Sequence, residues 1–193
     1  MRLCRRRVRA LRALLVLGLL APGLLVPGPS VAQDAHDEYE VKAAFLFRIG
    51  RAFTWPDSVL DENADTLRVG VLGRDPFGGS LRKVFRGKTS SQGLAFRVVE
   101  VASLEEARSC QVLFVPSGVD PERRKWLDEL GDSGTLLVGE VPEFVHDQGG
   151  ILALVLQDNR MGMVLNVEEL ASSGLQASSQ FLRLCTIVGD RSR

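Results

Sequence analysis

The chain has 193 residues, of which 45% are hydrophobic and 25% are charged, a composition typical of one globular domain and not of a disordered protein. The formal charge is zero, but the first 32 residues carry six arginines and no acid. The remainder holds 18 basic and 24 acidic side chains, a net charge of −6. An acidic domain is a poor candidate for binding nucleic acid or anionic membrane surfaces, so we expect no nucleic-acid partner.

The N-terminus has the layout of an export signal. A run of arginines precedes an apolar stretch at 14–26, and small residues follow at positions that suit cleavage near Ala32. The apolar stretch is short for a membrane span of about 20 residues, which favours cleavage over a retained anchor. We therefore expect residues 1–32 to be a cleaved signal peptide, 33–38 a flexible lead-in and 39–190 a single α/β domain of an exported protein.

Residues 39–56 (YEVKAAFLFRIGRAFTWP) are predicted to form the first helix, with Asp37 as its N-cap. Trp55 is predicted to be buried, because large aromatic side chains usually are. Phe47 points away from the main apolar side, and the sequence favours neither burial nor exposure for it. The side expected to face the core carries Val41, Phe45, Ile49, Ala52 and Phe53.

Strands and helices are predicted to alternate along the rest of the chain. This order favours a mainly parallel sheet of about six strands with helices on both faces. The tight-turn sequence QDNR at 157–160 makes the last two strands an antiparallel hairpin, placed at one edge of the sheet. The predicted strands are 67–72, 94–101, 111–115, 135–138, 151–156 and 161–166, and the predicted helices are 76–85, 103–108, 121–130, 142–146, 167–173 and 179–188.

Ligands of open α/β sheets lie beyond the carboxyl ends of the strands. In this chain those ends lead into the turns 73–79, 116–120 and 139–142 and into the loop after Val101. The first turn (GRDPFGG) precedes a helix and could receive an anion. It lacks the spacing of a dinucleotide-binding loop, and Asp75 would repel phosphate, so a structural turn is the favoured interpretation.

Catalytic and metal-binding patterns are weak. Ser80 and Lys83 match the SxxK spacing of penicillin-recognising enzymes, but the companion motifs are absent and the spacing arises easily on a helix. His36 and His146 are isolated from further ligands at metal-site spacing. We expect no catalytic residues, no metal and no cofactor, which favours binding or regulation over enzymatic activity.

Two cysteines remain after the predicted cleavage, Cys110 and Cys185. An oxidising compartment would permit a disulfide between them. Each lies among apolar residues, however, so the favoured interpretation is two small buried side chains without a bridge.

Several segments resemble the YfiR family of periplasmic regulators. They occur in the right order and cover most of residues 39–188. They are 39–56 (YEVKAAFLFRIGRAFTWP), 72–81 (LGRDPFGGSL), Gly87-Lys88, 110–115 (CQVLFV), 137–144 (LVGEVPEF), 149–151 (GGI), 159–166 (NRMGMVLN) and 174–184 (GLQASSQFLRL).

The resemblance implies a non-enzymatic protein of the Gram-negative periplasm. Such proteins bind the periplasmic sensor part of an inner-membrane diguanylate cyclase of the GGDEF type and repress it, which lowers cyclic di-GMP signalling and disfavours biofilm. In the best-known systems an OmpA-like outer-membrane lipoprotein sequesters the repressor. A homodimer is left open.

This chain departs from the family in its cysteines. Well-known members carry a cysteine pair near the segment that here spans 145–151, and this chain has none there. Of its own cysteines, only Cys110 falls at a position that the family also uses. Redox control through disulfides is therefore not expected.

Two other functions stay open. One is a periplasmic small-molecule-binding sensor for another signalling or transport system, with its crevice near 73–79. The other is a hydrolase that uses Ser80 and Lys83. For the repressor, the candidate partner-binding residues lie on or just after the first helix, and they are Phe47, Arg48, Arg51 and Trp55.

Overall fold

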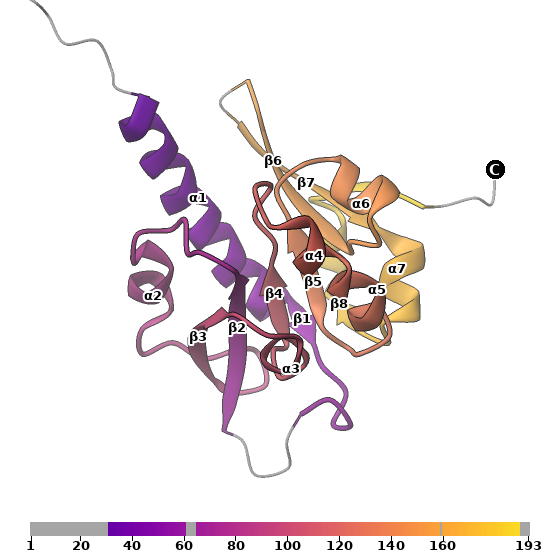
Figure 1. Ribbon diagram of the computed structural model, residues 1–193. Helices are drawn as coiled ribbons and strands as arrows, with labels where there is room; N and C mark the ends of the chain where they lie inside the picture. The colour runs from indigo at the N-terminus through magenta and orange to yellow at the C-terminus, as the bar shows by residue number, and fades with distance from the viewer. Residues whose placement is uncertain (1–30, 61–64, 159, 190–193) are drawn as a thin grey trace, which may run out of the picture.

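The computed structural model describes residues 31–60, 65–158 and 160–189 (Figure 1). The predicted signal peptide therefore lies almost wholly outside the described residues. Within the described part, seven strands make one sheet: β2 (Thr66–Leu72), β3 (Ala95–Val101), β4 (Val112–Phe114), β5 (Leu136–Gly139), β6 (Leu152–Gln157), β7 (Arg160–Asn166) and β9 (Thr186–Val188).

The strands are arranged in the order β3-β2-β4-β5-β6-β7-β9. Neighbours from β3 to β6 are parallel, β7 is antiparallel to β6, and β9 is parallel to β7. The predicted α/β fold with a mainly parallel sheet and a hairpin is confirmed.

Helices cover both faces of this sheet. On one face lie α1, α2, α7 and α8, whose buried residues share a cluster with Val69, Phe114 and Leu152. On the other face lie α3, α5 and α6, which pack on Leu113 and Leu137. The helices are α1 (Val31–Ala52), α2 (Ser80–Phe85), α3 (Leu104–Arg108), α4 (Pro121–Arg124), α5 (Trp126–Leu130), α6 (Glu143–Asp147), α7 (Val167–Ser172) and α8 (Ser179–Leu182).

The first helix begins earlier than predicted. Residues 33–38 are helical instead of forming a lead-in, and Asp37 lies inside α1, so its prediction as N-cap was wrong. Charge pairing at helical spacing favours the extra turns, because Glu38 Oε1 lies 2.5 Å from Lys42 Nζ one turn later.

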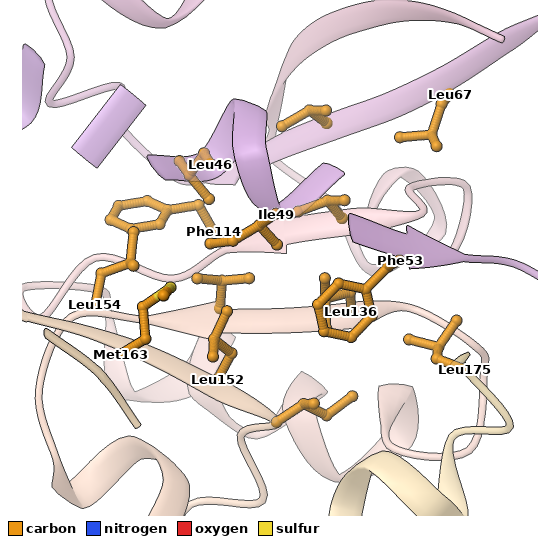
Figure 2. Packing of buried hydrophobic residues seen from close by; sticks show 14 of the residues in the cluster. Leu46, Ile49, Phe53, Leu67, Phe114, Leu136, Leu152, Leu154, Met163 and Leu175 are labelled. Atoms are coloured by element: carbon orange, nitrogen blue, oxygen red, sulfur yellow. The ribbon is translucent and has the colours of Figure 1, made fainter. Parts of the chain in front are cut away.

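The side of α1 that faces the sheet agrees only in part with the predicted one. Val41 is 44% exposed and Phe45 is only half-buried, whereas Leu46 and Ile49 point towards Phe114 and the central strands (Figure 2). The buried positions of the helix are Lys42, Ala43, Leu46, Ile49 and Gly50. The prediction was right for Ile49 and Phe53, which are fully buried, and wrong for Val41, because packing selected a face that includes a lysine and two small residues.

Gly50 has a packing role on this face. A Cβ at this position would lie 2.9 Å from Cε1 of Phe96, closer than real Cβ contacts come. The absence of a side chain therefore lets the Phe96 ring of β3 approach α1, which explains a glycine inside a helix that it would otherwise weaken.

The C-terminal end also departs from the prediction. The last helix, α8, ends at Leu182, and the chain continues into β9, which pairs with β7. The hairpin of β6 and β7 is therefore not at the edge of the sheet, because β9 forms that edge. A separate pair joins β1 (Phe53–Thr54) to β8 (Gln176–Ala177) and holds the end of α1 to the C-terminal part of the chain.

Candidate functional site

A cleft lies where the order of the strands reverses. From β2 the chain passes through α2 to β3, and then returns across β2 to reach β4 on its other side. Such a point leaves a crevice beyond the carboxyl ends of the two flanking strands. Here it measures about 430 Å³, and we call it the switch-point cleft. It is lined by Tyr39, Leu72, Gly73, Arg74, Pro76, Pro116, Ser117, Gly118, Val119, Asp120, Arg123 and Glu140.

Three of the turns singled out in the sequence meet in this cleft. Gly73 and Arg74 come from the turn after β2, Ser117 from the turn after β4, and Glu140 from the turn after β5. The rule that ligand-binding turns follow the carboxyl ends of parallel strands thus predicted the position of the cleft. The loop after Val101 does not contribute to its lining.

One wall of the cleft holds a buried ion pair. Lys42 Nζ lies 2.6 Å from Glu140 Oε2, and each side chain is only 4% exposed. The backbone N–H of Ser117 donates to Glu140 Oε1 at 2.6 Å, and the Tyr39 hydroxyl donates to the same oxygen at 3.3 Å. Lys42 also contacts Glu38 Oε1 and lies over the Tyr39 ring, 4.6 Å from its centroid. The carboxylate of Glu140 is therefore surrounded by donors.

This arrangement changes two pKa values. Burial opposes ionisation of Glu140, but the hydrogen bonds from Lys42 and Ser117 and the Lys42 charge outweigh it, so the pKa of Glu140 lies below its usual value. Burial, followed by the negative charge of Glu140, raises the pKa of Tyr39. At neutral pH the wall of the cleft therefore holds an ionised Glu140 and a neutral Tyr39 hydroxyl.

Two arginines reach the cleft from other elements. Arg74 is exposed in the turn after β2, and Arg123 is half-buried on α4. Nη1 of Arg123 lies 3.3 Å from the place that a Cβ on Gly73 would take. Asp75, which the sequence suggested would repel an anion, is not among the residues that line the cleft, and its Oδ1 accepts from the Phe77 N–H at 2.7 Å.

A second hollow, of about 600 Å³, lies on the outer side of α1. We call it the α1 groove. Phe47 forms its apolar floor, packed edge-to-face on Phe85 and Phe96, with ring centroids 5.7 and 5.9 Å away. Lys88 Nζ lies 4.3 Å from the centroid of the Phe47 ring. The lining residues are Ala44, Phe47, Arg48, Arg51, Ala52, Val84, Lys88, Ser178 and Gln180, and none of them is acidic.

The four candidate partner-binding residues divide between surface and core. Phe47, Arg48 and Arg51 meet in the α1 groove, with Arg48 and Arg51 exposed and Phe47 half-buried. Trp55 is only 1% exposed, and its Nε1 donates to the backbone carbonyl of Gln111 at 3.0 Å. Its predicted burial is confirmed, and its side chain is not available as a contact in this conformation.

The two cysteines are not bridged. Both are free, and they belong to packing clusters on opposite faces of the sheet. Cys110 is buried beside α3 and α5, whereas Cys185 is half-buried on the side of α1. The sheet between them explains why the alternative of a Cys110–Cys185 disulfide is wrong for this structure.

The remaining sequence motifs gain no support. Ser80 is buried and its hydroxyl donates to the carbonyl of Phe77 at 2.8 Å, while Lys83 is exposed on the same helix. Across the described ranges 31–60, 65–158 and 160–189, no group of three or more His, Cys, Asp or Glu residues could hold a metal ion. Nε2 of His36 instead lies 3.5 Å from Oε1 of Glu40, one turn later on α1.

Sequence reasoning missed Lys42, Glu140 and Arg123 as site residues. Lys42 and Glu140 are 98 positions apart, and each has the type of side chain that usually lies on the surface. One signal was present: Glu140 directly follows the buried strand β5, in a turn at its carboxyl end. Arg123 had no signal beyond its place on a short polar helix.

Comparison with known protein families identifies the family. A family model described as YfiR/HmsC-like matches residues 39–186. The chain belongs to the YfiR/HmsC-like family. No curated protein matches the sequence significantly. The matched range begins at Tyr39 and ends at the first residue of β9, so it includes both the switch-point cleft and the α1 groove.

Membership of the YfiR/HmsC-like family indicates a regulatory rather than a catalytic protein. Among the residues that the structure describes, no helix is long and apolar enough to cross a membrane.

Proposed function

We propose that this protein is a periplasmic repressor that binds the periplasmic sensor part of an inner-membrane GGDEF diguanylate cyclase and lowers cyclic di-GMP signalling. The observation that carries the proposal is the family match, which spans nearly the whole α/β domain from α1 to β9. The signal-peptide pattern of residues 1–32 supports export, with cleavage near Ala32.

The mechanism is a shift in the population of two cyclase states. A repressor that binds the inactive state of the sensor more tightly than the active state moves the equilibrium towards the inactive state. The free energy of this shift is at most the difference between the repressor's binding free energies for the two states. Such an effect needs a surface for reversible contact and no catalytic group.

The α1 groove is the surface that we assign to this contact. It combines an aromatic floor, Phe47, with the cations of Arg48, Arg51 and Lys88, in a domain whose overall charge is negative. Aromatic residues and arginine are enriched at protein interfaces and dominate their binding energy. The complementary partner surface would carry acidic residues around an apolar side chain.

Deletion of the gene tests the repressor function directly. Cellular cyclic di-GMP is expected to rise on deletion and to fall again when the wild-type gene is restored. Unchanged cyclic di-GMP would contradict the proposal.

Charge reversal in the α1 groove tests the assigned surface. The double variant Arg51→Glu/Lys88→Glu is expected to bind the isolated periplasmic sensor at least about tenfold more weakly, because each exposed charge that meets an opposite charge contributes to association. The matched control is Lys125→Glu, an exposed lysine between α4 and α5. Equal binding by the double variant and the wild type would remove the groove from the interface.

Two further partners belong to the proposal. An OmpA-like outer-membrane lipoprotein would sequester the repressor, and a second copy of this chain would make a homodimer. Light scattering of the mature chain, alone and with the lipoprotein, distinguishes a monomer, a homodimer and a mixed complex.

The switch-point cleft favours a second candidate function, a periplasmic small-molecule sensor for another signalling or transport system. Its position where the strand order reverses is the usual place for ligands in open α/β sheets. Ligand-induced thermal stabilisation of the chain without any protein partner would support this function.

A further inference from the structure

The switch-point cleft carries positive charge that the protein itself leaves unpaired. Of its two arginines, neither Arg74 nor Arg123 forms an ion pair within the described part of the chain. Of its two carboxylates, Glu140 pairs with Lys42, and Asp120 caps α4 by accepting from the backbone N–H of Glu122 at 2.9 Å. The guanidinium groups are therefore the groups in the cleft most available to a ligand.

The dimensions of the cleft suit a small molecule. Its volume of about 430 Å³ falls within the range of about 300–1,000 Å³ that is usual for small-molecule sites. Its lining combines apolar side chains with a few polar groups, as such sites do. The apolar part consists of Leu72, Pro76, Pro116, Val119 and the ring of Tyr39.

The backbone beside the arginines leaves room for a ligand. Gly73 has a φ of 78°, a conformation that side chains rarely adopt, and its missing Cβ would meet Arg123 Nη1 at 3.3 Å. A side chain at this position would displace the guanidinium of Arg123. Gly118, in the turn after β4, likewise leaves open space, because nothing lies within 4 Å of where its Cβ would be.

The buried pair gives this wall of the cleft a fixed shape. Glu140 receives hydrogen bonds from Lys42 of α1 and from the Ser117 N–H of the turn after β4. It thereby ties α1 to two turns that line the cleft, so the wall is held in place before any ligand arrives. Preorganised sites lose less free energy to ordering when they bind.

We propose that the switch-point cleft binds a small organic anion, with a carboxylate or phosphate group held by the guanidiniums of Arg74 and Arg123 and its apolar part against Tyr39 and Pro116. Planar guanidinium groups match both anions in geometry and charge, with paired N–H donors. This inference gives the ligand class for the small-molecule sensor described above, and it does not depend on repression of a cyclase.

Titration of the purified mature chain with two probe anions, inorganic phosphate and succinate, tests the inference. Calorimetry is expected to show saturable binding of at least one probe with a Kd below about 1 mM, the weak end of specific affinities. The amide NMR signals of Gly73, Ser117 and Gly118 are expected to shift with the same dependence on concentration. The tighter of the two probes identifies the anion as phosphate or carboxylate.

Variants distinguish this site from general attraction of anions. Arg74→Gln and Arg123→Gln are each expected to weaken binding about tenfold or more, the loss of one charge-assisted hydrogen bond. The matched control Arg86→Gln removes an exposed arginine that does not line the cleft and should leave the Kd unchanged. Two arginine variants are used so that a folding defect in one does not decide the result.

The inference is overturned if neither probe shows saturable binding, or if Arg86→Gln weakens binding as much as the two cleft variants do. The proposed repressor function is tested separately by deletion of the gene. A chain that binds an anion while its deletion leaves cyclic di-GMP unchanged would keep the inference and reject the repressor.

Discussion

Lys42 Nζ of α1 lies 2.6 Å from Glu140 Oε2, directly after β5, and both side chains are 4% exposed. This contact joins the first helix to the centre of the sheet across 98 positions of sequence. Removing two opposite charges from water costs several kcal/mol per ion, which their attraction and further hydrogen bonds must offset. The Ser117 N–H and the Tyr39 hydroxyl supply those further bonds.

Loss of one partner of this pair should be strongly destabilising. Lys42→Met keeps the volume of the side chain but leaves the Glu140 carboxylate without its closest cation, so we expect the free energy of unfolding to fall by about 3–5 kcal/mol. Urea unfolding followed by circular dichroism measures the change. A loss below about 1 kcal/mol would mean that Glu140 takes up water or a proton at little cost.

The double variant Lys42→Met/Glu140→Gln tests whether the cost of Lys42→Met comes from the unpaired Glu140 carboxylate. It removes both charges and keeps an amide oxygen that can accept from Ser117, so it should be more stable than Lys42→Met alone. The predicted recovery is at least about half of the loss, because much of the cost in the single variant comes from the uncompensated carboxylate. A double variant as unstable as Lys42→Met would contradict this explanation.

The ion pair of Lys42 and Glu140 also predicts how the free energy of unfolding depends on pH. Because the pKa of Glu140 is lower in the folded than in the unfolded chain, the unfolded state binds more protons as the pH falls. The contribution of Glu140 is therefore complete above the unfolded pKa of about 4.3 and is lost as the pH falls through the lower, folded value. Urea unfolding at several pH values below about 5 should show a shallower dependence in Lys42→Met/Glu140→Gln than in the wild type.

The cysteines predict a simple chemical result. Burial raises the pKa of Cys110 to about 11 and that of Cys185 to about 11, and neither is bridged. Mature protein isolated without reductant should therefore contain two thiols per chain after denaturation, as measured with Ellman's reagent. In the folded protein at pH about 8 both should react slowly, and Cys110 should be the slower because it is buried. The absence of free thiols after denaturation would indicate a disulfide.

Trp55 should contribute through its indole N–H as well as its bulk. Trp55→Phe removes the hydrogen bond to the Gln111 carbonyl, which still accepts from the Leu136 N–H at 2.8 Å. Because that carbonyl keeps one donor, we expect a loss of about 1–2 kcal/mol, mostly from the smaller ring. The control is Trp126→Phe, at a half-buried position on α5, which should cost less in urea unfolding.

Much of the fold follows from local patterns. Runs rich in apolar residues between turn residues predicted the six strands β2 to β7, and the signal was clearest for β4 and β5, which are buried along their whole length. The strand β9 was missed because Ser178 begins a helical turn and the apolar residues after it suit a helix equally well. That turn ends at Leu182, and pairing with β7 then determines the conformation of Thr186–Val188.

The residues of the site also divide into those that the local sequence predicted and those whose place depends on distant parts of the chain. The turns at the carboxyl ends of β2, β4 and β5 were predicted to hold ligand-binding residues, and they line the switch-point cleft. The buried charges of Lys42 and Glu140 were not predicted, because their burial depends on a partner 98 residues away. Hydrophobic periodicity cannot report such a pair.

For α1, the sequence is sufficient to predict the helix but not to predict which of its sides is buried. Its spacing of apolar and aromatic residues was enough to predict a helix and its YfiR-like signature, although the helix ends at Ala52 and the next two residues form β1 instead of continuing it to Pro56. Which side faces the sheet was decided only in the folded protein, where Val41 is exposed and Lys42 is buried. The reason is physical: local conformation depends on neighbouring residues, whereas burial depends on the surfaces that the rest of the chain brings to the helix.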